Sequence, residues 1–263
     1  MTPTSDSSAP DGTQAVRRAI NVLRVLARTG ELTAAELARE TGLSPATASR
    51  MAKVLLTEGM VRRNPVNGAY HLGARAALLG QAAQEVLGLD KALPPMRALR
   101  EQTGESVNLA IRDDAESVVL LRVQSKLPLR FEQTVGARFP LYSTASGKAM
   151  LSFSGTCQAY LDQLPSTLES VTTGTIRTRA KLRVDLKSTK ERGYAVDHEE
   201  NVEGVRCVGA PILDEDGRSV AALVVQAPSV RMDLARITQL GPVVIQVARE
   251  LAHVIPDYST LRY

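Results

Sequence analysis

The stretch Gly42–Lys53, "GLSPATASRMAK", predicts a short helix with two very different sides. Ser44 suits the N-cap, and Pro45 suits the first helical position because its missing N–H costs no hydrogen bond there. Helical spacing places apolar side chains on an inward side, namely Ala48, Met51, Leu55 and Leu56. The outward side carries small or polar side chains and two cations, namely Ala46, Thr47, Ser49, Arg50 and Lys53.

An outward side of this kind suits the major groove of DNA. A helix in that groove needs small polar side chains near the base edges and cations near the phosphates. Amphipathic helices with Arg and Lys outside are also common as plain solvent-exposed surfaces, so the helix alone leaves both interpretations open. The flanking sequence favours the first of them.

Two more helices are predicted just before this stretch. Residues 13–30, "TQAVRRAINVLRVLARTG", end at Gly30 and carry apolar residues at helical spacing, namely Val16, Ile20, Leu23, Leu26 and Ala27. The next helix begins at Thr33, which forms a capping-box pattern with Glu36, and it ends at Gly42. Only a tight turn then separates it from the helix that begins after Ser44.

A basic hairpin follows in residues 59–73, "GMVRRNPVNGAYHLG". Val61–Arg63 and Ala69–Leu72 are predicted strands joined through Asn67-Gly68, a strong short-range hairpin signal. Arg62 and Arg63 would stand on this hairpin. Two helices, a polar helix and a basic hairpin, in this order, predict a winged helix-turn-helix.

Charge is distributed unevenly along the chain. The formal net charge is +4, yet residues 13–75 hold ten Lys or Arg against four Glu, whereas residues 76–263 hold 22 of each sign. A positive excess confined to one segment indicates a polyanionic partner for that segment, although a solvated basic surface would have the same charge. Combined with the predicted elements, it favours double-stranded DNA. The candidate DNA-binding residues are Arg17, Arg18, Thr33, Ser44, Ala46, Thr47, Ser49, Arg50, Lys53, Arg62 and Arg63.

The rest of the chain has a different pattern. Residues 73–89 predict a helix whose apolar side is too broad for full exposure, and the same helix of a second subunit could cover it. "LPP" at 93–95 predicts a break in helical geometry and the entrance to a new unit. Strand-like runs then alternate with helices, and few strands alternate strictly between polar and apolar residues. We therefore expect a sheet covered on both faces by helices.

Several motifs together resemble the IclR-type transcriptional regulators, over Thr13 to about Tyr258. These motifs are "AVRRAINVL", "LSPATASRMAKVLLTEGMVRR", "PLYSTASGKAML" and "RGYAVDHEENVEGVRCVGAPILD". The resemblance implies an α+β fold of two domains: a winged helix-turn-helix over 13–75, a linker helix over 76–92 and a GAF-like α/β effector-binding domain over 93–258. Residues 1–12 would be a disordered leader. Family members are typically dimers or tetramers that bind a small molecule.

The effector site is predicted in part from the residues themselves. In "YSTASGKAML" the amides of Ala145, Ser146 and Gly147 would be unpaired at a helix N-terminus, which suits a carboxylate, and Gly147 would permit close approach. An ordinary capped helix is the alternative. The resemblance adds the remaining candidates, namely Phe131, Phe139, Asp197, Cys207, Val224 and Gln226. Val224 and Gln226 stand where members that bind small keto acids have two serines, which favours a larger organic acid, a sugar acid or an aromatic acid over glyoxylate or pyruvate.

Other chemistries are weaker interpretations. Asp197 and His198 are neighbours on a predicted strand and would point to opposite faces, so we expect no shared metal ion and no cofactor. Cys207 lies in an apolar strand, where a reactive thiolate is costly to form. An enzyme with a basic localising segment would need a nucleophile beside a base, but the three histidines are scattered and no hydrolase or P-loop motif occurs. An architectural DNA binder would leave the second domain without a role.

The sequence predicts no membrane anchor. The longest apolar runs, such as 221–227, are far shorter than the roughly 20 residues that a bilayer span requires. The polar first dozen residues predict no secretory signal, and the widely spaced Cys157 and Cys207 predict reduced thiols, so we expect a cytoplasmic protein. The sequence as a whole predicts a ligand-responsive regulator that binds a palindromic operator as a homo-oligomer. Repression is commoner in the family that the chain resembles, so we expect a repressor.

Overall fold

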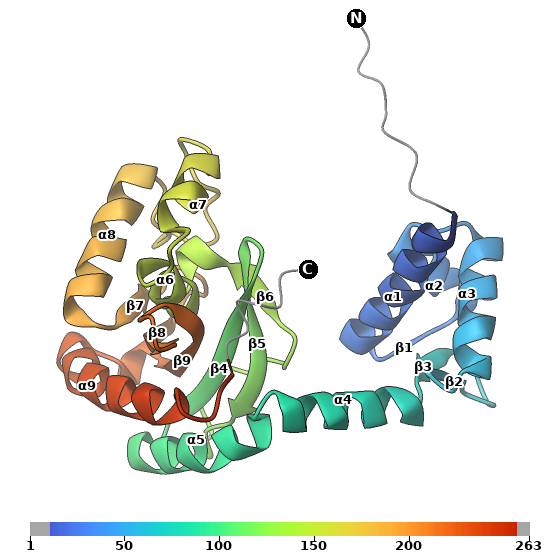
Figure 1. Cartoon of the computed structure of the whole chain (residues 1–263), viewed down its shortest axis with the longest axis horizontal. Helices are drawn as coiled ribbons and strands as arrows, with labels where there is room; N and C mark the ends of the chain where they lie inside the picture. The colour runs from blue at the N-terminus through green and yellow to red at the C-terminus, as the bar shows by residue number, and fades with distance from the viewer. Residues whose placement is uncertain (1–10, 257–263) are drawn as a thin grey trace, which may run out of the picture. The chain divides into compact units, whose positions relative to one another are not determined.

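The computed structural model describes residues 11–256, which form two compact units that divide between Glu85 and Val86 (Figure 1). The predicted domain limits at 75/76 and 92/93 lie on either side of this division. The predicted leader lies outside the described residues except for Asp11 and Gly12, which belong to the first helix. Within the described range, no helix has the length and apolar character that crossing a bilayer requires.

The first unit contains three helices, α1 (Asp11–Thr29), α2 (Ala34–Thr41) and α3 (Pro45–Thr57), and three short strands, β1 (Glu31–Leu32), β2 (Val61–Arg63) and β3 (Tyr70–Leu72). The strands form an antiparallel sheet in the order β1-β3-β2. The core of this unit consists of Val22, Val25, Leu26, Leu37, Ala52, Leu55, Val61 and Tyr70. The predicted helices and hairpin are confirmed, and β1 is an additional strand that the sequence analysis missed.

The predicted inward faces of α1 and α3 are partly wrong. Val16 and Ile20 are 58% and 45% exposed, because the core contacts only the second half of α1, where Val22 and Leu26 are buried. In α3 the side chain of Leu56 is 37% exposed, whereas Ala52 is fully buried. The residues of α3 that are buried are therefore Ala48, Ala52 and Leu55.

The second unit is built on a six-stranded antiparallel sheet with the order β6-β5-β4-β9-β8-β7. Its strands are β4 (Ser106–Asp113), β5 (Glu116–Val123), β6 (Arg138–Pro140), β7 (Ala195–His198), β8 (Val205–Leu213) and β9 (Ser219–Pro228). β9 lies at the middle of the sheet and is buried from Val220 to Pro228. A strand buried on both faces reads as a continuous apolar run, which explains the absence of polar alternation in the sequence.

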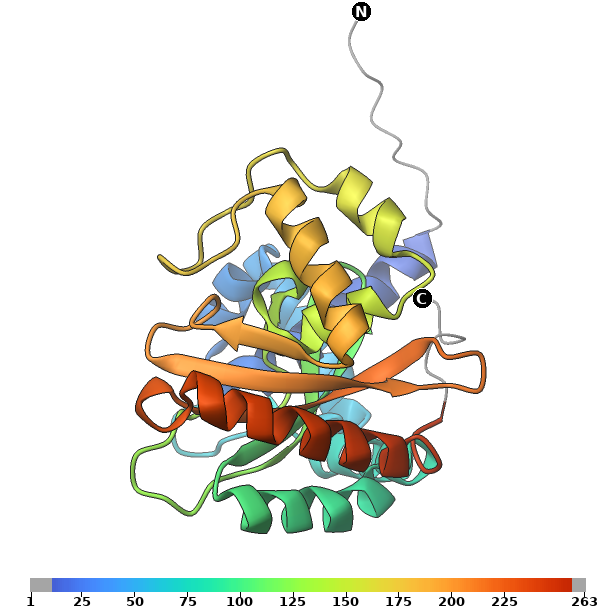
Figure 2. The ribbon, with the colours of Figure 1, turned by 90° about the vertical axis from the view of Figure 1, so that its left-hand side faces the viewer.

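Helices cover both faces of this sheet, as expected (Figures 1 and 2). On one face lie α5 (Leu89–Thr103) and α9 (Leu234–Leu251), which share a core with the strands. On the other face lie α6 (Ala145–Ser152), α7 (Cys157–Gln163) and α8 (Arg179–Arg192), with a second core. Single 3₁₀ turns, η1 (Leu141–Ser143) and η2 (Ser229–Arg231), precede α6 and α9.

The expected helix break at "LPP" is wrong. Pro94 and Pro95 lie inside α5, which continues through them to Gly104. A proline removes one helical hydrogen bond and disfavours helical geometry before it. Burial of Met96 and Leu99 on one side of α5 against the sheet outweighs that cost. The sequence analysis also missed β6 and α7, which are short.

Candidate functional site

The outward side of α3 is held in place by the caps of two helices. Thr33 forms the predicted capping box with Glu36, and Gly42 ends α2 in the left-handed conformation. Ser44 accepts a hydrogen bond from the amide of Thr47 at 3.2 Å, which fixes the first turn of α3. The short connection between the two caps sets the direction in which α3 leaves α2.

The cations on this surface are exposed to solvent. Ala46, Arg50 and Lys53 are exposed, and Thr47 and Ser49 are half-buried. Over residues 11–256, no ion pair includes Arg50 or Lys53. An exposed guanidinium and an exposed ammonium on one helix surface can therefore bind an anion without first breaking an internal salt bridge.

The hairpin presents one free arginine and one restrained arginine. Arg62 is opposite His71 in the antiparallel register of β2 and β3, and its side chain is exposed. Arg63 donates from Nε to the carbonyl of Gly68 at 3.0 Å and lies over the ring of Tyr70, which stiffens the turn. On the remaining predicted positions, Arg17 is exposed, Arg18 is half-buried, and Thr33 is engaged with Glu36 as a cap.

A small cavity lies in the second unit, where the start of α6 meets the sheet. Its volume is about 30 Å³, roughly the space of one water molecule. Seven of the nine predicted effector residues line it, namely Phe139, Ala145, Ser146, Asp197, Cys207, Val224 and Gln226. Its other lining residues, which the sequence analysis missed, are Asn108, Ala110, Val119, Gln133, Thr144 and Asn201.

Gly147 has a different role from the predicted one. Its amide is not free, because it donates to Thr144 Oγ1 at 3.0 Å. A Cβ at this position would lie 2.2 Å from the carbonyl oxygen of Leu141. Gly147 is therefore required by the close packing of α6 on the preceding turn, and the alternative of an ordinary capped helix is correct for this amide.

Phe131 is also outside the cavity lining. Its ring is partly buried against the core that α6 and α8 share. Its carbonyl accepts a hydrogen bond from the guanidinium of Arg122. The first-turn amides of Ala145 and Ser146 remain at the cavity wall, and they belong to the amides that an α-helix leaves without partners inside the helix.

A buried charge cluster lies behind the cavity wall. Lys148 on α6 is fully buried, and its Nζ lies 2.5 Å from Glu200 Oε1 and 3.0 Å from Asp185 Oδ2. Asp197 accepts a hydrogen bond from the amide of Glu200 at 2.7 Å. Burial, together with the negative charge of Glu200, raises the pKa of Asp197 to about 7. The cavity wall therefore contains a carboxyl group that changes its charge near neutral pH.

The groups around Asp197 differ in their burial and in their reactivity. The side chain of Asp197 is buried and that of His198 is exposed, as expected for adjacent strand positions. The described part of the chain has no group of three His, Cys, Asp or Glu residues placed to hold a metal ion. Burial raises the pKa of the Cys207 thiol well above its ordinary value, so Cys207 is a wall residue with little thiolate.

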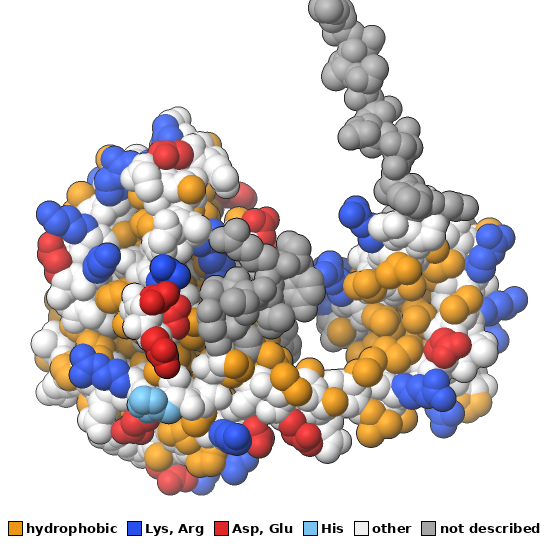
Figure 3. All heavy atoms as spheres, in the orientation of Figure 1, with side chains coloured by type: hydrophobic (Ala, Val, Ile, Leu, Met, Phe, Trp, Pro, Cys, Tyr) orange, Lys and Arg blue, Asp and Glu red, His pale blue; other side chains and the backbone are white. Residues whose placement is uncertain are grey.

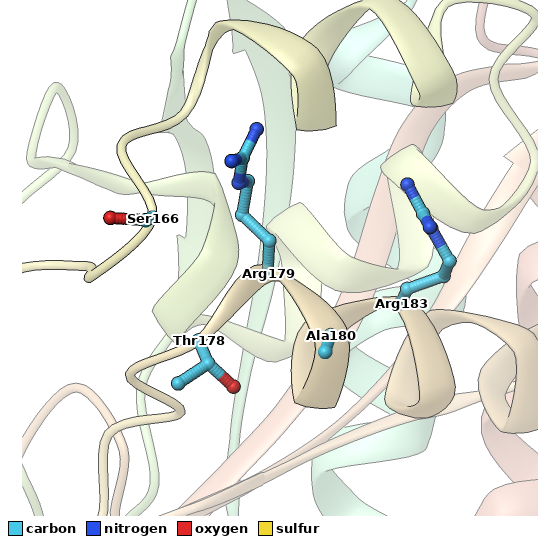
Figure 4. Close-up of a pocket in the computed structure, with 5 residues that line it drawn as sticks. All are labelled: Ser166, Thr178, Arg179, Ala180 and Arg183. Atoms are coloured by element: carbon cyan, nitrogen blue, oxygen red, sulfur yellow. The ribbon is translucent and has the colours of Figure 1, made fainter.

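A second hollow lies on the surface at the start of α8 (Figure 4). It measures about 470 Å³ and is open to solvent, with Arg179 and Arg183 side chains rising from one side of the helix. Thr178 caps the helix by accepting from the amide of Lys181. None of the predicted effector residues contributes to this hollow.

These features define a class of protein: a helix-turn-helix DNA-binding protein with a separate α+β unit that contains a small cavity. Residues 15–65 match the IclR helix-turn-helix domain, and residues 82–253 match the bacterial transcriptional regulator IclR C-terminal domain. The chain therefore belongs to the IclR family of transcriptional regulators. This agrees with the resemblance that the sequence motifs carry.

Individual relatives are similar over most of their length. The chain is 33% identical to the HTH-type transcriptional regulator BhcR of Paracoccus denitrificans, over 92% of this chain and 87% of that protein. It is 31% identical to the transcriptional repressor IclR of Escherichia coli, over 90% and 88%. An IclR homologue from Microbacterium hydrocarbonoxydans, solved in complex with 4-hydroxybenzoate, has the same fold, with a TM-score of 0.77 and 21% identity over 91% of this chain and 99% of that one.

Proposed function

We propose that the protein is a repressor whose affinity for a palindromic operator changes when a small organic acid occupies the cavity of the second unit. The observation that carries this proposal is the pairing of an exposed basic surface on α3 with a small cavity in a separate unit, whose lining includes polar side chains. Two relatives support repression as opposed to activation: the transcriptional repressor IclR, at 31% identity, and the acetate operon repressor, at 32% identity.

The proposed DNA contacts divide into two kinds. Ala46, Thr47, Ser49 and Arg50 on α3 would face base edges in the major groove. Lys53 and Arg62 would face phosphates, because each is an exposed cation free of internal ion pairs within the described residues. Arg63 would act mainly by stiffening the wing, since its guanidinium already bonds to Gly68.

The proposed effector is a carboxylic acid. The amides of Ala145 and Ser146 at the start of α6 suit a carboxylate, because a helix N-terminus carries partial positive charge. Complex formation by the Microbacterium homologue with 4-hydroxybenzoate supports an organic acid as the class. A ligand of that size would require the 30 Å³ cavity to widen.

The proposed assembly is a homo-oligomer in which a second copy of the chain covers α4 (Ala74–Val86). None of its residues is buried, and Leu78, Leu79 and Val86 are 64%, 61% and 79% exposed. Figure 3 shows hydrophobic side chains along this helix. Exposed apolar stripes of this kind mark interaction surfaces, and a second copy would place two α3 helices for two half-sites.

The experiment is a binding titration of the full-length protein on two duplexes. One duplex carries the region upstream of its own gene, and the other is a scrambled sequence of equal length and composition. The proposal predicts tighter binding to the first, weakening steeply with salt on both. Equal affinity for the two duplexes at every salt concentration would contradict a role at an operator.

A further inference from the structure

Three carboxamide side chains from separate segments meet at the cavity wall. Asn108 lies on β4, Gln226 on β9, and Gln133 in the loop between β5 and β6. Asn108 Nδ2 donates to Gln133 Oε1 at 3.2 Å and to Gln226 Oε1 at 3.3 Å. Asn108 and Gln226 are only 4% and 7% exposed. We refer to these three residues as the carboxamide cluster.

One acceptor atom of the carboxamide cluster is unsatisfied among the described residues. Within the described residues, the buried Oδ1 of Asn108 has no hydrogen-bond partner. Turning the Asn108 amide over would set Oδ1 against the two glutamine oxygens, which are acceptors as well. Buried polar groups are normally satisfied, so an unpartnered acceptor at a cavity wall indicates a ligand group that donates.

The cavity wall therefore combines two kinds of hydrogen-bonding group. Amides at the start of α6 suit an anion, whereas the carboxamide cluster offers an acceptor, and Asp197 stands on the same wall. A second carboxylate of a ligand would meet the lone pairs of Asn108 Oδ1. A ligand hydroxyl would instead donate to Oδ1 and reproduce the hydrogen bond that water would make there.

We infer that the cavity selects hydroxy monocarboxylic acids, with Asn108 as the residue that distinguishes a ligand hydroxyl from an oxo group or a hydrogen atom. This inference rests on the proposed function, because it assigns the ligand class of the same cavity. An oxo group has no proton to donate, so an oxo acid would leave Oδ1 unpaired and facing another acceptor. Sites that hydrogen-bond a hydroxyl discriminate strongly against analogues that lack it.

The test compares matched pairs of acids on the full-length protein by calorimetry and thermal shift. The pairs are 4-hydroxybenzoate with benzoate, lactate with pyruvate, and glycolate with glyoxylate. In each pair with measurable binding, the hydroxy acid should bind about tenfold or more tightly. Equal binding within the pairs, or tighter binding of the oxo acids, would overturn the inference, and this comparison in the wild type needs no variant.

Asn108→Leu tests the assignment to this residue. The variant should bring the affinity of the hydroxy acid down to that of its partner and leave the partner's affinity nearly unchanged. Gln124→Leu, an exposed carboxamide outside the cavity, is the control and should keep the wild-type ratio. A preference for the hydroxy acid that persists in a folded Asn108→Leu variant would overturn the role of Asn108.

The failures of the two proposals are distinguishable. If acids of every pair bind equally and still release the upstream duplex, the ligand class is wrong and the proposed function stands. If no carboxylic acid changes either the melting temperature or DNA binding, the proposed function is wrong and the inference falls with it.

Discussion

Asp197 combines a structural and an electrostatic role at the cavity wall. Its carboxylate holds the turn at Glu200, and Glu200 in turn pairs with the buried Lys148. Burial and the neighbouring negative charge raise the pKa of Asp197 to about 7, so in the folded protein it holds its proton up to neutral pH. Folding thus becomes coupled to proton uptake at this residue.

The first prediction concerns the pH dependence of stability. Because the pKa of Asp197 is raised in the folded state, its stabilising contribution is present below its unfolded value near 4 and is lost as pH rises through about 7. Asp197→Asn keeps the acceptor for the Glu200 amide and removes the titration. As the pH is raised from 5 to 8.5, the free energy of unfolding of the wild type should fall, relative to that of the variant, by on the order of 2 to 3 kcal/mol.

Denaturant unfolding at several pH values measures this difference. Asp216→Asn, an exposed carboxyl, is the matched control and should follow the wild type. Parallel pH profiles for Asp197→Asn and the wild type would show that Asp197 titrates as an ordinary aspartate.

Gly147 provides the second prediction at this scale. A Cβ there would collide with the backbone of Leu141, which cannot move as a flexible side chain can. Gly147→Ala should therefore lower the free energy of unfolding by about 1 to 3 kcal/mol, the usual cost of overpacking. Gly155→Ala, with open space around the added methyl, should have little effect. If both variants unfold alike, close packing against Leu141 is not what requires a glycine at position 147.

At the level of single residues, sequence patterns predicted local contacts better than distant ones. Caps at Thr33 and Ser44 depend on neighbours within one turn, and both are confirmed. Gln133 carries no local signal, since it reaches the cavity from a loop. A buried polar residue in an otherwise apolar strand, as at Asn108, is the one sequence sign that could have indicated a site residue.

Among the elements, α3 and the wing carry the DNA-binding account. Arg50→Ala should weaken binding to the upstream duplex more than binding to the scrambled duplex, because a base contact contributes to specificity by about 1 to 3 kcal/mol. Arg62→Ala on the wing is the matched comparison and should weaken both alike while reducing the salt dependence. Affinity titrations on both duplexes at several salt concentrations give these quantities. Equal losses for Arg50→Ala on the two duplexes would make Arg50 a phosphate contact.

Helix α4 carries the account of assembly. Leu78→Gln combined with Leu79→Gln should shift the protein toward monomers in sedimentation or light scattering, because both side chains are mostly exposed and a partner would bury them. Val230→Gln, an exposed apolar residue elsewhere in the chain, is the control. An unchanged oligomeric state would show that α4 is not the interface.

Sequence predicted helices with clear caps and failed where packing overrides local preference. Gly30 follows the last residue of α1, and Gly42 ends α2, at the predicted positions. Helix α5 passes through Pro94 and Pro95 because its buried side is held against the sheet, a contact that no local pattern reports. Strand β6 has three residues, too few for a periodic signal.

For the whole molecule, the division of labour follows the distribution of charge. The positive excess lies in residues 13–75, whereas residues 76–263 hold 22 charges of each sign. A basic unit gains affinity for any duplex through counterion release, whereas a cavity in a separate unit can bind a neutral or anionic metabolite. Regulation then requires only that ligand binding and DNA binding favour different states of the chain.

The most direct test of this central claim is the affinity of the full-length protein for its upstream duplex, titrated with and without a saturating hydroxy acid whose binding thermal shift has established. The account predicts that the acid changes the dissociation constant about 5- to 150-fold, the usual range of allosteric coupling, with weaker binding if the protein is a repressor that the acid releases. An identical dissociation constant with the acid demonstrably bound would contradict it.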